Sequence, residues 1–149
     1  MALSSMMKWN LHYMDVKTTF LNGVIEEEVY IEKPQGFEVE DKRTHVCKLK
    51  KPLYGLRQAP RAWYGRIDRN LASLDFTKSK ANPNLYFKVI LLLYVDDLFL
   101  TRNEKQIVEC KKKLAEEFEM KDLGLMHYFV GREVWKNTKG IFLNRESIE

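Results

Sequence analysis

Residues 90–100, ILLLYVDDLFL, constrain the fold most, because two adjacent carboxylates, Asp96 and Asp97, interrupt an apolar run. Burying a charge costs several kcal/mol unless it is paired or binds a metal ion. A hairpin turn is the least costly arrangement, since Asp tolerates turn conformations. We therefore predict that one strand closes at Tyr94-Val95, that the next opens at Leu98, and that both carboxylates lie at the hairpin tip.

The composition predicts a soluble globular domain. The 149 residues suffice for one domain with a hydrophobic core, and 45% hydrophobic and 31% charged residues are ordinary values. A net charge of +4 is compatible with a polyanionic partner without requiring one. Cys47 and Cys110 stand alone, which is typical of reduced thiols, and with no signal peptide in the sequence we expect a cytoplasmic protein. The apolar run at 89–94 is shorter than the ~20 residues that span a bilayer, so we expect no membrane partner.

Hydrophobic spacing and capping signals predict the main helices and strands. Alternation over residues 11–16 predicts a strand that ends at Asp15. A helix begins at Pro60 and runs to about Leu74. Asn103 and the glutamine three residues later predict the capped start of a second helix, and we expect Gly124 to end the helical region. A strand over 127–135, a turn at 137–140 and a strand over 141–143 then predict a C-terminal β-hairpin.

This order of elements is strand, helix, two hairpin strands, helix, strand, with small strands before the first long helix. It predicts an α+β fold with a split, ferredoxin-like β-α-β-β-α-β sheet. In such a sheet the first strand lies beside the central hairpin. Asp15 would then face Asp96, although the two are far apart in the sequence.

Three carboxylates at the ends of adjoining strands suit a hard divalent cation, Mg²⁺ or Mn²⁺. Two such ions ~3.5–4 Å apart can hold the attacking and leaving oxygens of a phosphoryl transfer. Successive strand residues point to opposite faces. We therefore expect Asp96 to be the ligand that faces Asp15, with Asp97 near the metal but less directly used. The alternative is a solvated Asp-Asp turn, with Asp15 merely ending a strand.

Five segments of the sequence resemble the reverse transcriptase of copia-type LTR retrotransposons, and they cover nearly the whole chain in the expected order. They are MDVKTTFLNG at 14–23, EEEVYIEKPQGF at 26–37, VCKLKKPLYGLRQAPRAWY at 46–64, LYVDDLFLT at 93–101 and FEMKDLGLMHYFVGREV at 118–134.

The resemblance implies the palm of an RNA-directed DNA polymerase. Asp15 corresponds to the first catalytic aspartate, and Asp96 and Asp97 to the paired aspartates of the palm. The carbonyl of Val16 is expected to contact metal, and the implied cofactor is two Mg²⁺ or Mn²⁺ ions. In the implied reaction a primer 3′-hydroxyl attacks the α-phosphate of a deoxynucleoside triphosphate and releases pyrophosphate. The implied partners are an RNA or DNA template with its primer and the rest of a Gag-Pol-type polyprotein, with virus-like particles as a further location.

The same resemblance assigns residues that handle the nucleotide and the primer. Phe20 corresponds to the bulky residue that excludes a ribonucleotide 2′-hydroxyl, although read alone it could be a core aromatic. Gln58 corresponds to the glutamine that contacts the incoming nucleotide. The hairpin that grips the primer end corresponds to His127, Tyr128, Phe129, Val130 and Gly131.

Several departures from the family pattern bear on activity. The chain begins inside the palm, and the upstream finger strands and the downstream thumb, connection and RNase H parts are not in it, so we expect a partial domain that does not polymerise alone. Residues 88–91 run straight through where the family has a polar turn, so the two strands would merge or the first would lose its pairing. Arg102 stands where glycine is common, and Arg132 where an apolar residue is usual.

Two other interpretations stay open. The chain could be a non-catalytic remnant that binds the nucleic-acid backbone through basic residues, namely Lys48, Lys50, Lys51, Arg57 and Arg61. Alternatively, it could be the product of a decayed reading frame that never folds stably.

Overall fold

The computed structural model describes residues 7–37, 45–129, 132–137 and 140–145, and only the backbone from residue 128 onward. The chain divides into two compact units. The first comprises Met1–Lys17 and Ala72–Glu149, and the second comprises Thr18–Leu71. Among the described residues, no helix has the length and apolar character needed to cross a membrane.

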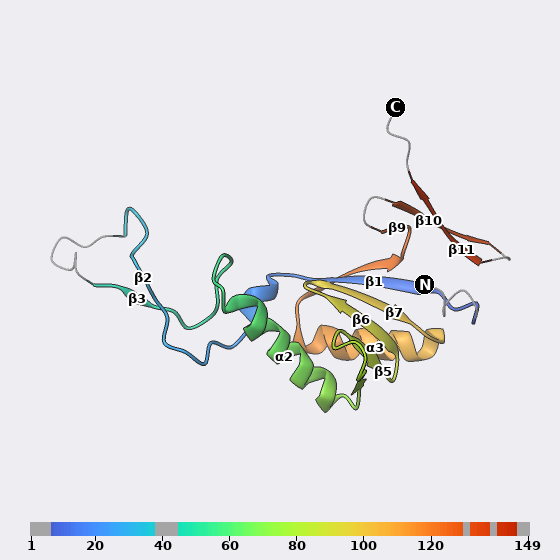
Figure 1. Ribbon diagram of the computed structural model, residues 1–149, viewed down its shortest axis with the longest axis horizontal. Coiled ribbons are helices and arrows are strands. Elements are labelled where there is room, and N and C mark those ends of the chain that lie inside the picture. Colours follow the sequence, from blue (N-terminus) through green and yellow to red (C-terminus); the bar gives the residue numbers. More distant parts are fainter. Residues whose placement is uncertain (1–6, 38–44, 130–131, 138–139, 146–149) are drawn as a thin grey trace. The chain divides into compact units, whose positions relative to one another are not determined.

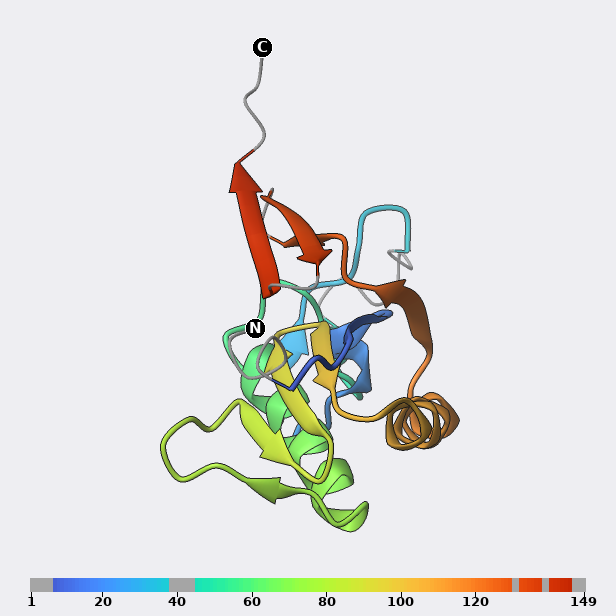
Figure 2. The ribbon, with the colours of Figure 1, turned by 90° about the vertical axis from the view of Figure 1, so that its right-hand side faces the viewer.

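The first unit is built on a six-stranded sheet in the order β4-β5-β6-β7-β1-β8 (Figure 1). The pairings along this order are antiparallel. Helix α3, Glu104–Glu117, lies along one face of the sheet (Figures 1 and 2). The strands are β1 Leu11–Val16, β4 Thr77–Lys78, β5 Leu85–Phe87, β6 Ile90–Tyr94, β7 Asp97–Thr101 and β8 Met120–Leu125.

The core of this unit follows the spacing of apolar residues in the sequence. Met14 and Val16 of β1 are buried, while Tyr13 and Asp15, which alternate with them along the strand, are half-buried. The helix α3 buries its residues at helical spacing, Ile107, Cys110 and Leu114. Strands β1 and β6 thus alternate between a buried and a more exposed face, whereas β7 buries residues on both of its faces.

The second unit contains a short 3₁₀ helix η1, Thr19–Asn22, and the paired strands β2, Tyr30–Ile31, and β3, Cys47–Lys48. Most of helix α2, Ala59–Ser73, also belongs to it. Gly23 follows η1 at a close approach, where an added Cβ would lie 2.9 Å from Pro52 and 3.0 Å from Ala62. A larger residue would therefore separate η1 from α2.

Several predicted elements are confirmed. The strand at residues 11–16 is β1, and the helix predicted from Pro60 is α2, which buries Trp63, Ile67 and Leu71. The Asn103 side chain caps α3 by accepting a 3.0 Å hydrogen bond from the backbone N–H of Gln106. Over the described residues the fold is α+β, with antiparallel sheets and the α-helices α2 and α3.

The expected merging or loss of pairing at residues 88–91 is wrong. Strands β5 and β6 pair antiparallel, with Leu85 opposite Leu92, and Lys88 and Val89 form the turn between them. Lys88 adopts a φ of 150°, which a tight connection needs and a straight strand does not. The guanidinium of Arg102 donates a hydrogen bond to the Lys88 carbonyl. Residues 88–91 and Arg102 both depart from the family pattern, and in this chain the side chain of Arg102 binds the turn at Lys88.

The expectation that Gly124 ends a helical region is also wrong. Helix α3 ends at Glu117, and Gly124 lies within strand β8 with a φ of 73°. The pairing of β8 with β1 shifts between Tyr13 and Met14, so β8 carries a bulge there. Glycine is favoured at such a bulge because it adopts positive φ without steric cost.

The predicted C-terminal β-hairpin is confirmed as β10, Arg132–Asn137, paired with β11, Gly140–Arg145. The single strand expected over 127–135 is divided into β9, Tyr128–Phe129, and β10, which pair antiparallel. The side chain of Arg132 lies outside what the structure describes.

Candidate functional site

The hairpin of β6 and β7 presents two of the three predicted aspartates. Strand β6 ends at Tyr94, Val95 and Asp96 form the turn, and Asp97 opens β7. Val95 adopts a φ of 54°, as a two-residue hairpin turn requires. A left-handed conformation costs an L-residue other than glycine about 1–2 kcal/mol. The tip therefore holds its carboxylates on a strained turn, a feature that often marks functional sites.

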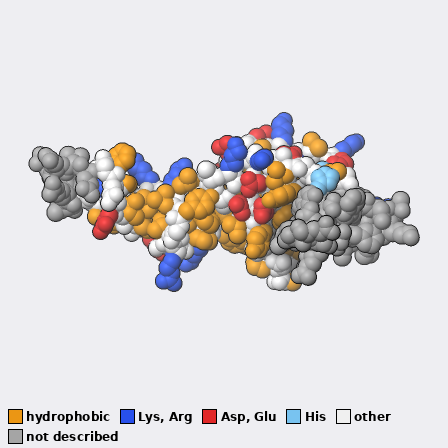
Figure 3. Space-filling view, turned by 90° about the horizontal axis from the view of Figure 1, so that it is seen from above, with side chains coloured by type: hydrophobic (Ala, Val, Ile, Leu, Met, Phe, Trp, Pro, Cys, Tyr) orange, Lys and Arg blue, Asp and Glu red, His pale blue; other side chains and the backbone are white. Residues whose placement is uncertain are grey.

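The third aspartate lies beside them, because β1 is the neighbour of β7. Asp15 is directly opposite Asp97 on one side and Lys121 of β8 on the other. The backbone N–H of Val16 donates a 2.9 Å hydrogen bond to the carbonyl of Asp96. The sheet thus brings Asp15, Asp96 and Asp97 together where β1 ends and β7 begins. The face of the molecule seen in Figure 3 carries acidic side chains beside hydrophobic ones.

The register corrects which carboxylate faces Asp15. We expected Asp96 in that position, whereas Asp97 occupies it. Asp96 belongs to the turn and not to the strand, so the alternation of strand side chains begins at Asp97. Which of the two ligates metal stays a prediction.

Tyr13 is a contact residue that the sequence patterns did not single out. Its hydroxyl donates a 2.6 Å hydrogen bond to Oδ1 of Asp97. Its ring stacks on the ring of Phe99, with centroids 5.2 Å apart and planes inclined by 19°. Tyr13 precedes Asp15 by two positions, and this spacing along a strand places it on the same face of the sheet.

The negative charge of this group is not fully compensated. Burial raises the pKa of Asp97, and the charges of Asp96 and Asp15 raise it further, against the lowering effect of the Tyr13 hydrogen bond. The pKa of Tyr13 is raised, chiefly by its hydrogen bond to Asp97. The charge of Asp15 also contributes to a raised pKa at Lys17, whose main cause is the hydrogen bond to Glu119 at 2.7 Å.

The donor chemistry of the three aspartates fits Mg²⁺ or Mn²⁺, which bind carboxylate oxygens. A divalent cation would also remove the like-charge repulsion that raises the pKa of Asp97. Within the described ranges, no three or more His, Cys, Asp or Glu side chains are arranged as a group that could hold a metal ion. The residues therefore fit the cation by donor type, without forming a closed coordination shell.

Phe20 and Gln58 belong to the second unit, so the structure describes them apart from the three aspartates. Phe20 is half-buried in η1, and its ring lies at 54° to that of Tyr54, with centroids 4.7 Å apart. Gln58 directly precedes α2 and lines a cavity of about 600 Å³. Phe20 thus has a packing contact as well as its predicted role.

Two of the five predicted basic residues, Arg57 and Arg61, line the same cavity as Gln58. A third arginine, Arg69, also lines this cavity, and its guanidinium lies 3.9 Å from a carboxylate oxygen of Glu26. The other predicted residues, Lys48, Lys50 and Lys51, are exposed, and the ammonium of Lys48 is paired with Glu28.

The predicted primer grip is described only in part. His127 is exposed, and Tyr128 and Phe129 form β9. Val130 and Gly131 lie outside the described residues.

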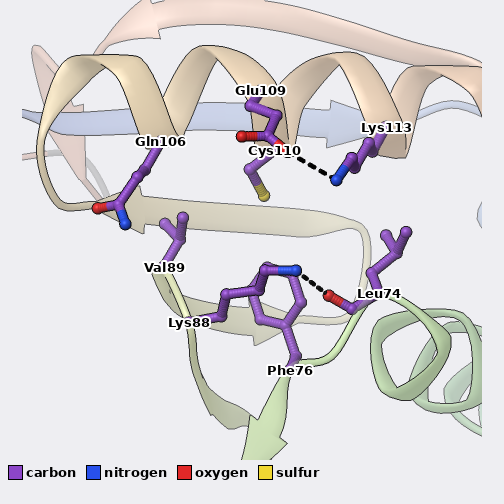
Figure 4. Close-up of a pocket in the computed structure, with 8 residues that line it drawn as sticks. All are labelled: Leu74, Phe76, Lys88, Val89, Gln106, Glu109, Cys110 and Lys113. Carbon is purple, nitrogen blue, oxygen red and sulfur yellow. Dashed lines mark hydrogen bonds and ion pairs between the residues drawn. The ribbon is translucent and has the colours of Figure 1, made fainter.

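A second, smaller cavity in the first unit has no catalytic chemistry. It measures about 80 Å³, and Figure 4 shows the residues that line it, including Cys110. The ammonium of Lys88 donates to the Leu74 carbonyl at 2.5 Å, and Lys113 pairs with Glu109 at 2.7 Å. Burial raises the pKa of the Cys110 thiol to about 12, so it stays protonated and is no nucleophile near neutral pH.

Residues 1–148 match the family described as reverse transcriptase (RNA-dependent DNA polymerase). The chain is 39% identical to the retrovirus-related Pol polyprotein from transposon TNT 1-94 of Nicotiana tabacum, over 98% of this chain and 12% of that protein. It is 35% identical to the corresponding polyprotein from transposon RE1 of Arabidopsis thaliana, over 92% of this chain and 10% of that protein. With the putative transposon Ty5-1 protein of Saccharomyces cerevisiae it shares 33% identity, over 85% of this chain and 44% of that protein.

Proposed function

Because this chain belongs to the reverse transcriptase (RNA-dependent DNA polymerase) family, as a fragment of the copia type, we propose that it forms the palm of an RNA-directed DNA polymerase within a retrotransposon polyprotein. The observation that carries the proposal is the register that sets Asp97 opposite Asp15 beside the turn that holds Asp96. The position of β1 between β7 and β8 supports a split, ferredoxin-like palm.

The proposed reaction is the attack of a primer 3′-hydroxyl on the α-phosphate of a deoxynucleoside triphosphate, with release of pyrophosphate. Asp15, Asp96, Asp97 and the carbonyl of Val16 would hold two divalent ions. Such ions supply charge stabilisation at the attacking and leaving oxygens. The chain's own contribution is to bring Asp15 and Asp97 opposite each other on adjoining strands, with Asp96 in the turn beside them.

Substrate selection is proposed for residues of the second unit. Phe20 would exclude a ribonucleotide by steric contact with its 2′-hydroxyl, and its packing against Tyr54 holds the ring in place. Gln58 would contact the incoming nucleotide from the start of α2. Arg57 and Arg61, on the same cavity as Gln58, would bind phosphates of the nucleic acid.

We further propose that the isolated chain does not polymerise, because no three of its described carboxylates are arranged as a group that could hold a metal ion. Primer extension on an RNA template, with Mg²⁺ or Mn²⁺, tests this directly. We expect no extended product. Processive extension that disappears in Asp96→Asn would refute the proposed inactivity and would support the catalytic assignment.

A second candidate function is non-catalytic binding of nucleic acid. The observation that favours it is the cavity lined by Arg57, Arg61 and Arg69. Binding to a primer–template duplex would then weaken steeply as salt rises and would be unchanged in Asp96→Asn. Absence of binding at low salt would exclude this function.

A further inference from the structure

We propose that Tyr13 is a positioning residue that fixes the Asp97 carboxylate for metal binding, at the end of the sheet where β7 begins. This role rests on the proposed function, because it presumes that the aspartates bind divalent cations. It concerns a contact of this chain's own, the 2.6 Å hydrogen bond from the Tyr13 hydroxyl to Oδ1 of Asp97.

The position of the Tyr13 hydroxyl is set by the sheet itself. Tyr13 and Phe99 are cross-strand partners of β1 and β7, and their rings stack. This contact restricts the two side-chain torsions of Tyr13, so that its oxygen stays where Asp97 can accept a hydrogen bond. Asp97 is the residue of β7 that directly follows the strained turn, so this hydrogen bond ties its side chain back to β1.

The hydrogen bond from Tyr13 to Oδ1 does not prevent the Asp97 carboxylate from binding a cation. Each carboxylate oxygen has two lone pairs, so Oδ1 can accept from Tyr13 while Oδ2, or the second lone pair of Oδ1, meets a cation. Hydrogen-bond partners of this kind orient metal ligands, and their loss typically lowers metal affinity by about 10–100-fold. The competing explanation is that Tyr13 only packs against Phe99.

The substitution Tyr13→Phe separates the two explanations, since it keeps the ring and removes the hydroxyl. Tyr94→Phe is the matched control. Tyr94 lies opposite Asp97 on the other neighbouring strand, is exposed, and its hydroxyl makes no hydrogen bond among the described residues. Tyr94→Phe should leave the melting temperature unchanged, whereas Tyr13→Phe should lower it modestly, because it removes one hydrogen bond to a carboxylate, and should still fold.

The experiment titrates the whole chain with Mn²⁺ and follows free Mn²⁺ by electron paramagnetic resonance. We expect Tyr13→Phe to weaken binding by about tenfold or more, and Tyr94→Phe to leave it unchanged. In protein with ¹³C-labelled tyrosine, the ring signal that is absent from Tyr13→Phe identifies Tyr13. That signal should shift on Mg²⁺ addition, and the shift should be lost in Asp97→Asn.

Two other results would overturn the proposal in distinguishable ways. Unchanged Mn²⁺ affinity in Tyr13→Phe, together with weakened binding in Asp97→Asn, would reject the positioning role and leave the metal site standing. Failure of the unsubstituted chain to bind Mn²⁺, or binding that Asp15→Asn, Asp96→Asn and Asp97→Asn all leave unchanged, would reject the metal site and with it the role of Tyr13.

Discussion

Among single residues, Asp97 has a charge that the surrounding fold disfavours, since burial and the neighbouring charges of Asp96 and Asp15 raise its pKa. When the pKa of a carboxyl is higher in the folded than in the unfolded state, the folded protein binds the proton more tightly. For Asp97 the unfolded-state pKa is the ordinary value of 3.8. Its contribution to stability is therefore fully present below that value and is lost as pH rises through the folded pKa.

We accordingly predict that Asp97→Asn is more stable than the unsubstituted chain at pH 7. The gain should shrink as pH falls through the raised pKa of Asp97 and disappear below 3.8, where Asp97 becomes neutral in both states. Urea unfolding of both proteins from pH 3 to pH 8 measures this difference. A gain that is constant over this range would show that Asp97 is not the titrating group.

Asp122 provides a control of opposite sign. Burial would raise its pKa, but hydrogen bonds from Lys111 and from the N–H of Gly124 lower it overall. The Lys111 side chain is only 14% exposed, and its ammonium lies 2.8 Å from Asp122. Asp122→Asn should therefore be less stable at pH 7, with a deficit that disappears as pH falls through the lowered pKa.

The residue scale also shows what the sequence could and could not predict. Asp15, Asp96 and Asp97 were identified because a carboxylate next to a buried strand costs free energy unless it is paired or binds a cation. Tyr13 was missed, because its hydrogen bond depends on a side-chain rotamer and on cross-strand register. The choice between Asp96 and Asp97 as the residue facing Asp15 depended on where the turn ends, which the apolar pattern does not specify.

At the scale of the elements, the tight turn of the β6–β7 hairpin places Val95 in a strained, left-handed backbone conformation. We predict that Val95→Gly is at least as stable as the unsubstituted chain, with a gain of up to about 1 kcal/mol. Val95 is 49% exposed, so the side chain contributes little by burial. Thermal unfolding measures the change.

The matched control is Val108→Gly in α3, where the side chain is 63% exposed. Its backbone is helical, so the same substitution relieves no strain and should destabilise by roughly a few tenths of a kcal/mol, the difference in helix propensity between valine and glycine. Equal losses at both positions would contradict the role of strain at the hairpin tip.

The turn between β5 and β6 yields a second prediction at this scale. Arg102→Met keeps the aliphatic stem but removes the hydrogen bond to the Lys88 carbonyl, and should cost about 1 kcal/mol. Lys105→Met removes an exposed cation nearby and should change stability by less than about 0.5 kcal/mol. Chemical denaturation compares the two variants, and equal effects would show that the Arg102 contact contributes nothing.

Elements with strong periodicity or caps were predictable, and those defined by backbone conformation alone were not. Helices α2 and α3 follow apolar spacing, Pro60 and Asn103. Strand β8 was missed because MKDLGL has no clear apolar alternation and its glycine resembles a stop signal. The turn at Lys88 was missed because neither lysine nor valine favours positive φ.

At the scale of the whole molecule, the residues proposed for polymerisation are divided between two units. The three aspartates belong to the first unit, whereas Phe20, Gln58 and the predicted basic residues belong to the second. Sequence motifs predicted all of them, because the resemblance to reverse transcriptases runs across both units. Their joint action on one substrate stays a proposal.

A chimaeric polymerase tests this joint action most directly. In it, the chain replaces the matching segment of the Nicotiana tabacum transposon polyprotein, to which it is 39% identical. Primer extension on an RNA template with Mg²⁺ is then measured for the chimaera and for its Asp15→Asn, Asp96→Asn and Asp97→Asn variants. We predict extension by the unsubstituted chimaera and a loss of at least about a hundredfold in each variant, because metal-assisted stabilisation supplies several kcal/mol. Extension that all three substitutions leave intact would refute the catalytic role of the three aspartates.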